Sequence, residues 1–214
     1  MKKIYIAKDT NRILQDYLQE KGYSLELISS EGLVDPPISC HPDVFLCKLG
    51  LGDDAMFIHA LDSELGMGYP AEAAFNAACT GKYFIHNLKV TAPRLLDAAR
   101  SAGMELIHVP QGYAKCSTVI VDERSIITYD RGIEKACSSA GLNVLLITPG
   151  HVLLPGYTTG FIGGCSGRIE DEVIFNGNLS AHPDFDRIRD FIQSRGLKCV
   201  WFKEYPLTDI GSII

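Results

Sequence analysis

The sequences CSTVIVDERSIITYD at 116–130 and CSGRIEDEVIFNGN at 165–178 share one pattern, and this pattern decides the predicted fold. Each begins with Cys-Ser and contains two short apolar runs separated by a charged turn. An amphipathic stretch follows each, and then a glycine and a last apolar run, in SAGLNVLLI at 139–147 and SRGLKCVWF at 194–202. Short apolar runs predict strands, and apolar residues at helical spacing predict a helix. Each copy therefore predicts a β-β-α-β unit.

A glycine at the end of each predicted helix extends the repeat over the chain. Gly22, Gly103, Gly141 and Gly196 each precede an apolar residue and a short predicted strand. Glycine suits this position because it adopts a left-handed conformation that closes a helix without a Cβ clash. Self-similarity at roughly 40 residues is typical of repeat architectures. The spacing indicates about five units, with a degenerate unit at 61–70, where two glycines and a proline leave no room for a helix.

The other elements are predicted from apolar periodicity and from helix-capping residues. We expect Asp9 or Thr10 to cap the first helix, and Thr91 to cap the helix at 92–102. The glycines and prolines of 31–42 predict a loop without regular structure. The remaining predictions are strands at 3–7, 24–29, 43–50, 55–60, 71–78, 82–86 and 209–214.

The two ends of the chain complement each other in this scheme. The start supplies a strand, a helix and a strand but lacks the first strand of a unit, whereas 209–214 is a strand with no helix after it. Pairing them completes one β-β-α-β unit and protects an open sheet edge. We therefore predict an α/β protein with one domain, 1–214, built as a closed five-bladed α/β propeller.

Composition sets the class of protein. The chain has 214 residues, 46% of them hydrophobic and 21% charged, which is typical of a globular domain. A net charge of −6 with no basic run argues against a nucleic-acid partner. No apolar run reaches the roughly 18 residues of a membrane span, and the first residues lack the apolar core of a signal peptide. We expect a cytoplasmic protein.

The seven cysteines show no pattern of a metal or disulfide framework. Their number is odd, and the sequence contains neither a Cys-x-x-Cys motif nor zinc-ligand spacing. We expect reduced thiols, no metal and no cofactor.

The strings KYFIHN at 82–87, SIITYD at 125–130 and VIFNGN at 173–178, with their helices and glycines, resemble the pentein superfamily of guanidino-group modifying enzymes. That superfamily includes arginine deiminase, agmatine deiminase and dimethylarginine dimethylaminohydrolase. The resemblance covers nearly the whole chain and implies the propeller fold, in a compact branch of unknown function. It also implies a cysteine nucleophile near the C-terminus, a histidine acid/base, carboxylates that hold the cation, and a small guanidine or amidine as ligand.

The C-terminal segment departs from that pattern. Ser212 or Ile213 stands where the resemblance implies the cysteine. One interpretation is a degenerate member that is non-catalytic or binds a small molecule. The alternative is a cysteine-dependent hydrolase, similar to a deiminase or dimethylaminohydrolase, with a relocated nucleophile.

Two cysteines are candidates for that relocated nucleophile. Cys116 and Cys165 stand at the same place in the repeat, where first strands would line the centre. A thiolate attacks an electrophilic carbon, and the backbone N–H groups of a glycine-rich turn can bind an oxyanion. His151 follows Gly150 as in the Gly-His turn of the family, but Leu153 replaces the carboxylate implied two residues on. The structural alternative is that these small residues only pack tightly around the centre.

Further candidates would line the same central channel and bind a ligand. They are Gly163, Gly164, Ser166, Ser117, Asn76, Asp209 and Ser212. The last strand, if exposed, could also pair with another copy of the chain and form a homodimer.

Overall fold

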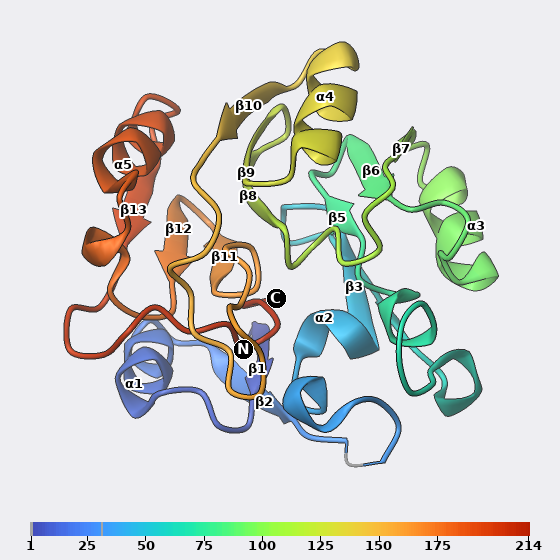
Figure 1. Ribbon diagram of the computed structural model, residues 1–214, viewed down its shortest axis with the longest axis horizontal. Coiled ribbons are helices and arrows are strands. Elements are labelled where there is room, and N and C mark those ends of the chain that lie inside the picture. The colour runs from blue at the N-terminus through green and yellow to red at the C-terminus, as the bar shows by residue number, and fades with distance from the viewer. Residues whose placement is uncertain (1, 31) are drawn as a thin grey trace.

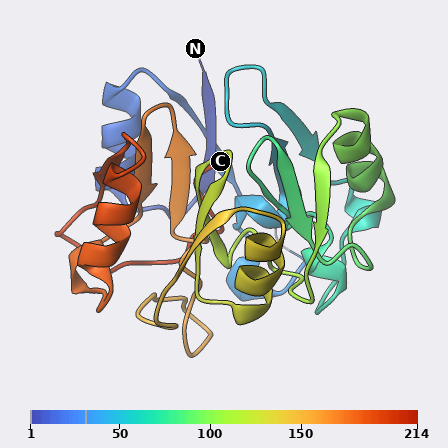
Figure 2. The same cartoon turned by 90° about the horizontal axis from the view of Figure 1, so that it is seen from above.

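The computed structural model describes residues 2–30 and 32–214. Four nine-residue helices lie at the periphery, and the strands lie closer to the middle (Figure 1). A view at 90° places the green α3 at one edge and the blue α1 and red α5 at the opposite edge (Figure 2). The helices are α1 Arg12–Glu20, α2 Pro42–Phe45, α3 Pro93–Ser101, α4 Arg131–Ser139 and α5 Phe185–Gln193. The short 3-10 helices are η1 Pro36–Ile38, η2 Asp62–Glu64, η3 Ala71–Ala73 and η4 Leu179–Ala181.

The strands of the described residues form five small sheets. Two sheets have two strands each: β1 Lys3–Ala7 with β2 Ser24–Ile28, and β3 Leu46–Leu49 with β4 Met56–His59. Three sheets have three strands each: β5 Ala78–Cys79, β6 Tyr83–His86 and β7 Glu105–His108; β8 Thr118–Asp122, β9 Ser125–Thr128 and β10 Asn143–Leu146; β11 Ser166–Ile169, β12 Glu172–Phe175 and β13 Lys198–Val200.

The unit that begins at Thr118 has the predicted order of elements. Strand β8 pairs antiparallel with β9, which pairs parallel with β10 after the chain has passed through α4. Asp130 begins the helix, since its Oδ1 accepts hydrogen bonds from the N–H groups of Gly132 (2.7 Å) and Ile133 (2.9 Å). Gly141 follows the helix with a φ of 87°, which favours glycine. Local sequence therefore determines both ends of α4.

The second copy has the same order. Strand β11 is antiparallel to β12, and β12 is parallel to β13 across α5. Ile188 and Ile192 of α5 are fully buried and pack with Val173 and Phe175 of the sheet. The sheet of β5, β6 and β7 again repeats this order around α3. The chain is thus a mixed α/β protein with small sheets, each helix covering its sheet with an apolar face.

The two ends of the chain meet through main-chain hydrogen bonds. Tyr5 and Ile214 exchange two of them, with N···O distances of 2.8 and 3.1 Å. The Ile213 N–H donates to the Ser166 carbonyl at 3.0 Å. The segment 209–214 therefore lies between β1 and β11, although it is not a regular strand as predicted. It is buried, so the exposed edge on which pairing with another copy would depend is not present there.

The structure corrects two predicted strands. The first turn of the predicted strand 43–50 is the helix α2, with Pro42 at its first position, where the missing N–H costs nothing. The predicted strand 71–78 begins as the 3-10 helix η3, and only Ala78–Cys79 pairs as β5. The predicted loop 31–42 contains the 3-10 helix η1.

Two predicted helix caps are also corrected. Asn11, and not Asp9 or Thr10, caps α1, because its Oδ1 accepts from the Ile13 N–H at 3.0 Å. The hydroxyl of Thr10 donates instead to the Ala7 carbonyl at 2.7 Å. Ala92 precedes α3, and the hydroxyl of Thr91 contacts a ring nitrogen of His86 at 2.7 Å.

Candidate functional site

Five polar side chains from distant parts of the sequence meet in the interior. We call them the central cluster: Asp43, Asn76, Lys115, Cys116 and Ser212. Asp43 lies on α2, Asn76 lies just before β5, Lys115 and Cys116 lie just before β8, and Ser212 lies in the C-terminal segment. All except Lys115 have at most 4% of their surface exposed. The segments that begin successive units therefore contribute polar groups to one place.

The carboxylate of Asp43 is the acceptor at the middle of this cluster. Its Oδ2 accepts hydrogen bonds from the Cys116 thiol (3.0 Å) and the Ser212 hydroxyl (2.6 Å). Its Oδ1 is buried and has no hydrogen-bond partner among the described residues. Burial raises the pKa of Asp43, and the positive charge of Lys115 opposes this effect. The site therefore lacks one hydrogen-bond donor. A buried oxygen without a donor costs free energy of folding.

Asn76 fixes the position of Cys116. Its Nδ2 donates to the Cys116 Sγ at 3.1 Å, and its Oδ1 accepts from the Cys116 N–H at 3.0 Å. Burial, together with the negative charge of Asp43, raises the pKa of the Cys116 thiol well above its usual range. The sulfur is therefore a protonated hydrogen-bond donor in this arrangement, and not a thiolate.

Lys115 supplies the positive charge of the cluster. Its Nζ donates to the Ser212 Oγ at 2.8 Å and to the Gly163 carbonyl at 3.3 Å. Burial lowers the pKa of Lys115, and the nearby Asp43 carboxylate opposes the shift. The positive charge of Lys115 therefore partly balances the buried carboxylates of Asp43 and Asp209.

Asp209 is a second buried carboxylate beside the cluster. Its oxygens accept from the N–H groups of Phe161 and Gly211, each at 2.9 Å. Burial raises the pKa of Asp209 to about 6, against the lowering effect of these two hydrogen bonds. The Nδ1 of His41 lies 3.8 Å from Asp209 Oδ1, and burial lowers the pKa of His41. His41 is therefore neutral near neutral pH.

Two glycines allow the segments to approach so closely. A Cβ on Gly163 would lie 2.2 Å from the Lys115 carbonyl oxygen, and a Cβ on Gly164 would lie 2.0 Å from Asp209 Oδ1. The Gly164 N–H already donates to the Cys116 carbonyl at 2.9 Å. This N–H is therefore occupied and is not free for the oxyanion role that the sequence suggested.

A cavity of about 80 Å³ opens beside the central cluster. His41, Cys116 and Asp209 form its polar part. The other lining residues are apolar or aromatic, apart from one threonine: Ile38, Val44, Tyr113, Leu154, Tyr157, Thr159 and Phe161. A small concave site with apolar walls and a few converging polar groups is the usual form of a ligand site.

Glu72 adds a third buried carboxylate behind the wall of this cavity. The Tyr113 hydroxyl donates to Glu72 Oε1, while Glu72 Oε2 is buried without a partner in the described residues. Burial, together with this contact, raises the pKa of Tyr113. Two carboxylate oxygens near the cavity, Asp43 Oδ1 and Glu72 Oε2, are therefore without a hydrogen-bond donor among the described residues.

The structure brings together six of the residues that the sequence singled out. Cys116, Asn76, Ser212, Gly163, Gly164 and Asp209 all belong to the central cluster or contact it. Ser166 donates to the Gly163 carbonyl at 3.0 Å, and the Ser117 hydroxyl lies 3.2 Å from the Tyr129 hydroxyl. These two serines hold the surrounding main chain and side chains in place.

Cys165 and His151 have other surroundings. Cys165 is fully buried in an apolar core, its thiol donates to the Ile162 carbonyl at 3.1 Å, and burial raises its pKa well above the usual range. His151 is exposed, and its ring lies 5.4 Å from that of His182, beside a separate hollow. Neither residue lines the cavity next to Cys116.

Sequence reasoning missed His41 and Asp43, although a signal for them was present. The tripeptide His-Pro-Asp at 41–43 has the histidine and the carboxylate two residues apart, the spacing that was sought at His151. The same tripeptide recurs at 182–184, where the Asp184 carboxylate accepts from the Thr148 N–H at 2.6 Å instead. Sequence spacing alone therefore does not distinguish the two copies.

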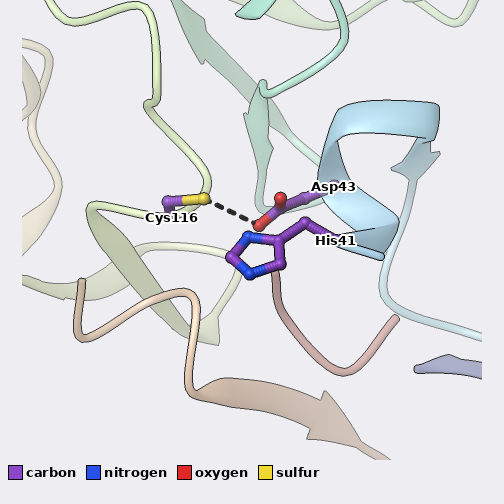
Figure 3. Close-up of side chains that lie close together, drawn as sticks. All are labelled: His41, Asp43 and Cys116. Atoms are coloured by element: carbon purple, nitrogen blue, oxygen red, sulfur yellow. Dashed lines mark hydrogen bonds between the residues drawn. The ribbon is translucent and has the colours of Figure 1, made fainter. Parts of the chain in front are cut away.

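His41, Asp43 and Cys116 also form a group of potential metal ligands (Figure 3). One ligand atom from each lies within 4.8 Å of the others, and all three residues are buried. A histidine nitrogen, a carboxylate oxygen and a cysteine sulfur together form a donor set that zinc accepts. The expectation of no metal rested on the spacing of ligands along the sequence. Such spacing does not detect ligands at 41–43 and 116 that only the folded chain brings together.

The architecture around this site is that of the pentein-fold enzymes. A crystal structure of a dimethylarginine dimethylaminohydrolase adduct with 4-chloro-2-hydroxymethylpyridine matches with a TM-score of 0.54 and 11% identity, over 94% of this chain and 92% of the other. A variant of C. jejuni agmatine deiminase with substrate bound matches with a TM-score of 0.52 and 9% identity, over 94% and 87% of the two chains. C. jejuni agmatine deiminase itself matches at 0.51 and 9%, over 96% and 91%. At this identity the likeness shows the fold alone.

The chain belongs to the family described as "Family of unknown function (DUF6873)", whose model matches residues 5–214. A comparison with curated proteins finds no match. None of the helices in the described ranges has the length and apolar character needed to cross a bilayer.

Proposed function

We propose that this pentein-fold protein binds a small cationic guanidine or amidine at the central cluster without forming a covalent bond to it. The observation that carries this proposal is the buried Asp43 Oδ1, which has no hydrogen-bond donor among the residues that the structure describes. An N–H group of an amidinium would supply that donor. Hydrogen bonds that involve a charged group stabilise a complex by about 1.5–3 kcal/mol each.

The charge balance of the interior supports a cationic ligand. Asp43 and Asp209 are both at most 3% exposed, and Lys115 is the cation that contacts the cluster. His41 is neutral because burial lowers its pKa. With both carboxylates ionised, the group carries one uncompensated negative charge. A monocation would neutralise it, and charge pairing is strong in a site that excludes water.

The walls of the cavity suit the same ligand class. Tyr113, Tyr157 and Phe161 contribute aromatic surface. The faces of aromatic rings attract planar cations. A cavity of about 80 Å³ is small, so the expected ligand places one compact planar group inside and leaves any tail outside.

We also propose the closed form of the fold. The main-chain hydrogen bonds between Tyr5 and Ile214 join the two ends of the chain. They support a single domain, 1–214, in which five blades close into an α/β propeller and the fifth blade combines elements from both ends.

One observation favours a second function, a cysteine-dependent hydrolase. Cys116 both lines the cavity and contacts a carboxylate, so a bound amidine would lie near its sulfur. The raised pKa of that thiol argues against this function, because the thiolate is the reactive form. We therefore place non-covalent binding first.

Calorimetric titration with agmatine, arginine and guanidinium tests the proposal. We expect at least one of them to bind the native protein, and Asp43→Asn to weaken that binding by about tenfold or more, the factor that corresponds to 1.4 kcal/mol. Asp97→Asn is the matched control, since this carboxylate is 73% exposed and should not affect affinity. Equal affinities of the native protein and Asp43→Asn would overturn the proposal, as would the absence of binding.

A further inference from the structure

We propose that His41, Asp43 and Cys116 form a binding site for a divalent transition-metal ion, with Zn²⁺ as the best-fitting ion. The three side chains come from two segments and point toward one another (Figure 3). This site goes beyond the organic ligand proposed above and does not depend on it.

The geometry requires only a small adjustment. Zinc lies about 2.3 Å from sulfur and about 2.0–2.2 Å from nitrogen or oxygen, so tetrahedral ligand atoms lie roughly 3.3–3.8 Å apart. The three ligand atoms lie within 4.8 Å of one another, and Cys116 Sγ is 3.0 Å from Asp43 Oδ2. Side-chain rotations that move the ligand atoms by about 1 Å would therefore bring all three atoms to bonding distance of one ion.

The neighbouring residues form the second layer that metal ligands usually have. Asn76 Nδ2 donates to the Cys116 sulfur at 3.1 Å, and Ser212 donates to Asp43 Oδ2 at 2.6 Å. Asp209 Oδ1 lies 3.8 Å from the His41 ring. Donors of this kind orient the ligand atoms, and a carboxylate beside a ligating histidine orients its ring and raises its basicity. Asp43 Oδ2 faces Cys116 and His41 and is the oxygen that would bind the metal (Figure 3), while Oδ1 is buried without a partner among the described residues.

The fourth coordination position would face the cavity. His41 and Cys116 both line it, so the metal would lie at its polar end. A site with three protein ligands leaves one position for water or another small ligand.

The charges of the metal ion and its ligands balance when the ion binds and one proton leaves. The Cys116 thiol loses its proton to solvent when the sulfur–metal bond forms, and Asp43 binds as a carboxylate. The two charges of the ion are then matched by one thiolate and one carboxylate. A thiol has to lose its proton to bind a metal as a thiolate, so binding should release a proton and strengthen as the pH rises.

The metal and the organic cation would both use the Asp43 carboxylate. They therefore exclude each other, but each is measured separately on the native protein. Zinc binding without guanidinium binding would support this site and overturn the proposed function. Guanidinium binding without zinc binding would overturn this site alone.

Titration with Co²⁺, followed by displacement with Zn²⁺, tests the site. We expect a tetrahedral cobalt spectrum with a thiolate charge-transfer band, which zinc abolishes. Cys116→Ser should remove that band, whereas the control Cys199→Ser should keep it, because Cys199 lies on β13 away from the cluster. Titration in two buffers of different ionisation enthalpy should show the release of a proton.

A second variant separates ligation from folding. His41→Gln keeps the sulfur and should weaken cobalt binding by at least about tenfold while the charge-transfer band persists at saturation. Circular dichroism checks that each variant is folded, and if Cys116→Ser is unfolded, His41→Gln decides. A native protein without the charge-transfer band, or unchanged cobalt affinity in His41→Gln, would overturn the site.

Discussion

The thiol of Cys116 donates a hydrogen bond of 3.0 Å to the Oδ2 of Asp43, across a sequence separation of 73 residues. This contact places the cysteine that the repeat singled out beside a carboxylate that sequence reasoning missed. It also determines the state of the sulfur, because a neighbouring negative charge and burial both disfavour a thiolate. The sulfur is therefore held as a hydrogen-bond donor to the carboxylate.

Alkylation of the native protein should be slow at Cys116. Because the thiol is 4% exposed and its pKa is raised well above the usual range, little thiolate exists near neutral pH. Iodoacetamide at about pH 7, with mass spectrometry to locate the adducts, should modify the partly exposed Cys40 first. Rapid modification of Cys116 would show that the protein stabilises a thiolate and would favour the hydrolase.

Asp209 should make stability depend on pH between about 4 and 6. Burial raises its pKa from 3.8 to about 6 in the folded protein. Between these two pH values, the folded state therefore holds a proton on Asp209 that the unfolded state has lost. The contribution of this proton to the free energy of unfolding is full below about pH 4 and is lost as the pH rises to about 6. A shift of about two pKa units corresponds to roughly 3 kcal/mol.

Urea unfolding at several pH values measures this contribution. The free energy of unfolding of the native protein should fall by about 2–3 kcal/mol relative to Asp209→Asn between pH 4 and 6. The comparison between the two proteins removes the contributions of other groups. Parallel pH profiles for the two proteins would contradict the assignment.

Gly164→Ala should destabilise the protein and disturb the cluster. A Cβ there would lie 2.0 Å from Asp209 Oδ1, so the carboxylate has to move and lose its main-chain partners. We expect a loss of about 1–3 kcal/mol in the free energy of unfolding. In the control Gly52→Ala the nearest atom is the tip of the Asp54 side chain at 2.9 Å, which can rotate away. Equal stability of the two variants would be inconsistent with the close packing at the centre.

Asn76→Ala should also lower stability. It leaves the buried N–H of Cys116 without its acceptor at 3.0 Å, which costs about 1–3 kcal/mol. The exposed Asn143 provides the control, because Asn143→Ala removes no such partner and should change stability by about 0.5 kcal/mol or less. Thermal or urea unfolding of both variants makes the comparison.

The sequence predicted those parts of the fold that local patterns determine. Asp130 and Gly141 mark the ends of α4 because capping and left-handed closure depend on residues within one turn. The strands at 43–50 and 71–78 were predicted less well, since tertiary contacts decide where Pro42 starts a helix and where pairing begins. The predicted strand is absent over 71–77, where the chain forms the 3-10 helix η3 at Ala71–Ala73 and then a turn.

The candidate site could be predicted only in part. The repeat singled out Cys116, and the resemblance to the pentein superfamily singled out Ser212, while Asn76 was a candidate for the central channel. Asp43 was missed because its carboxylate acts through a contact with Cys116 that no local pattern encodes. His151 was chosen for a Gly-His turn, but that turn lies on the surface. Only the tertiary structure shows which His-Pro-Asp tripeptide faces the cavity.

Binding of a cation without covalent chemistry can be measured with agmatine or arginine, using the native protein and Cys116→Ala. Calorimetry records the binding, and the release of ammonia or amine is followed over hours. We expect binding to both proteins, with dissociation constants within about threefold, which is less than 1 kcal/mol, and no turnover by either. Turnover by the native protein that is lost in Cys116→Ala would contradict this expectation and establish the cysteine as a nucleophile.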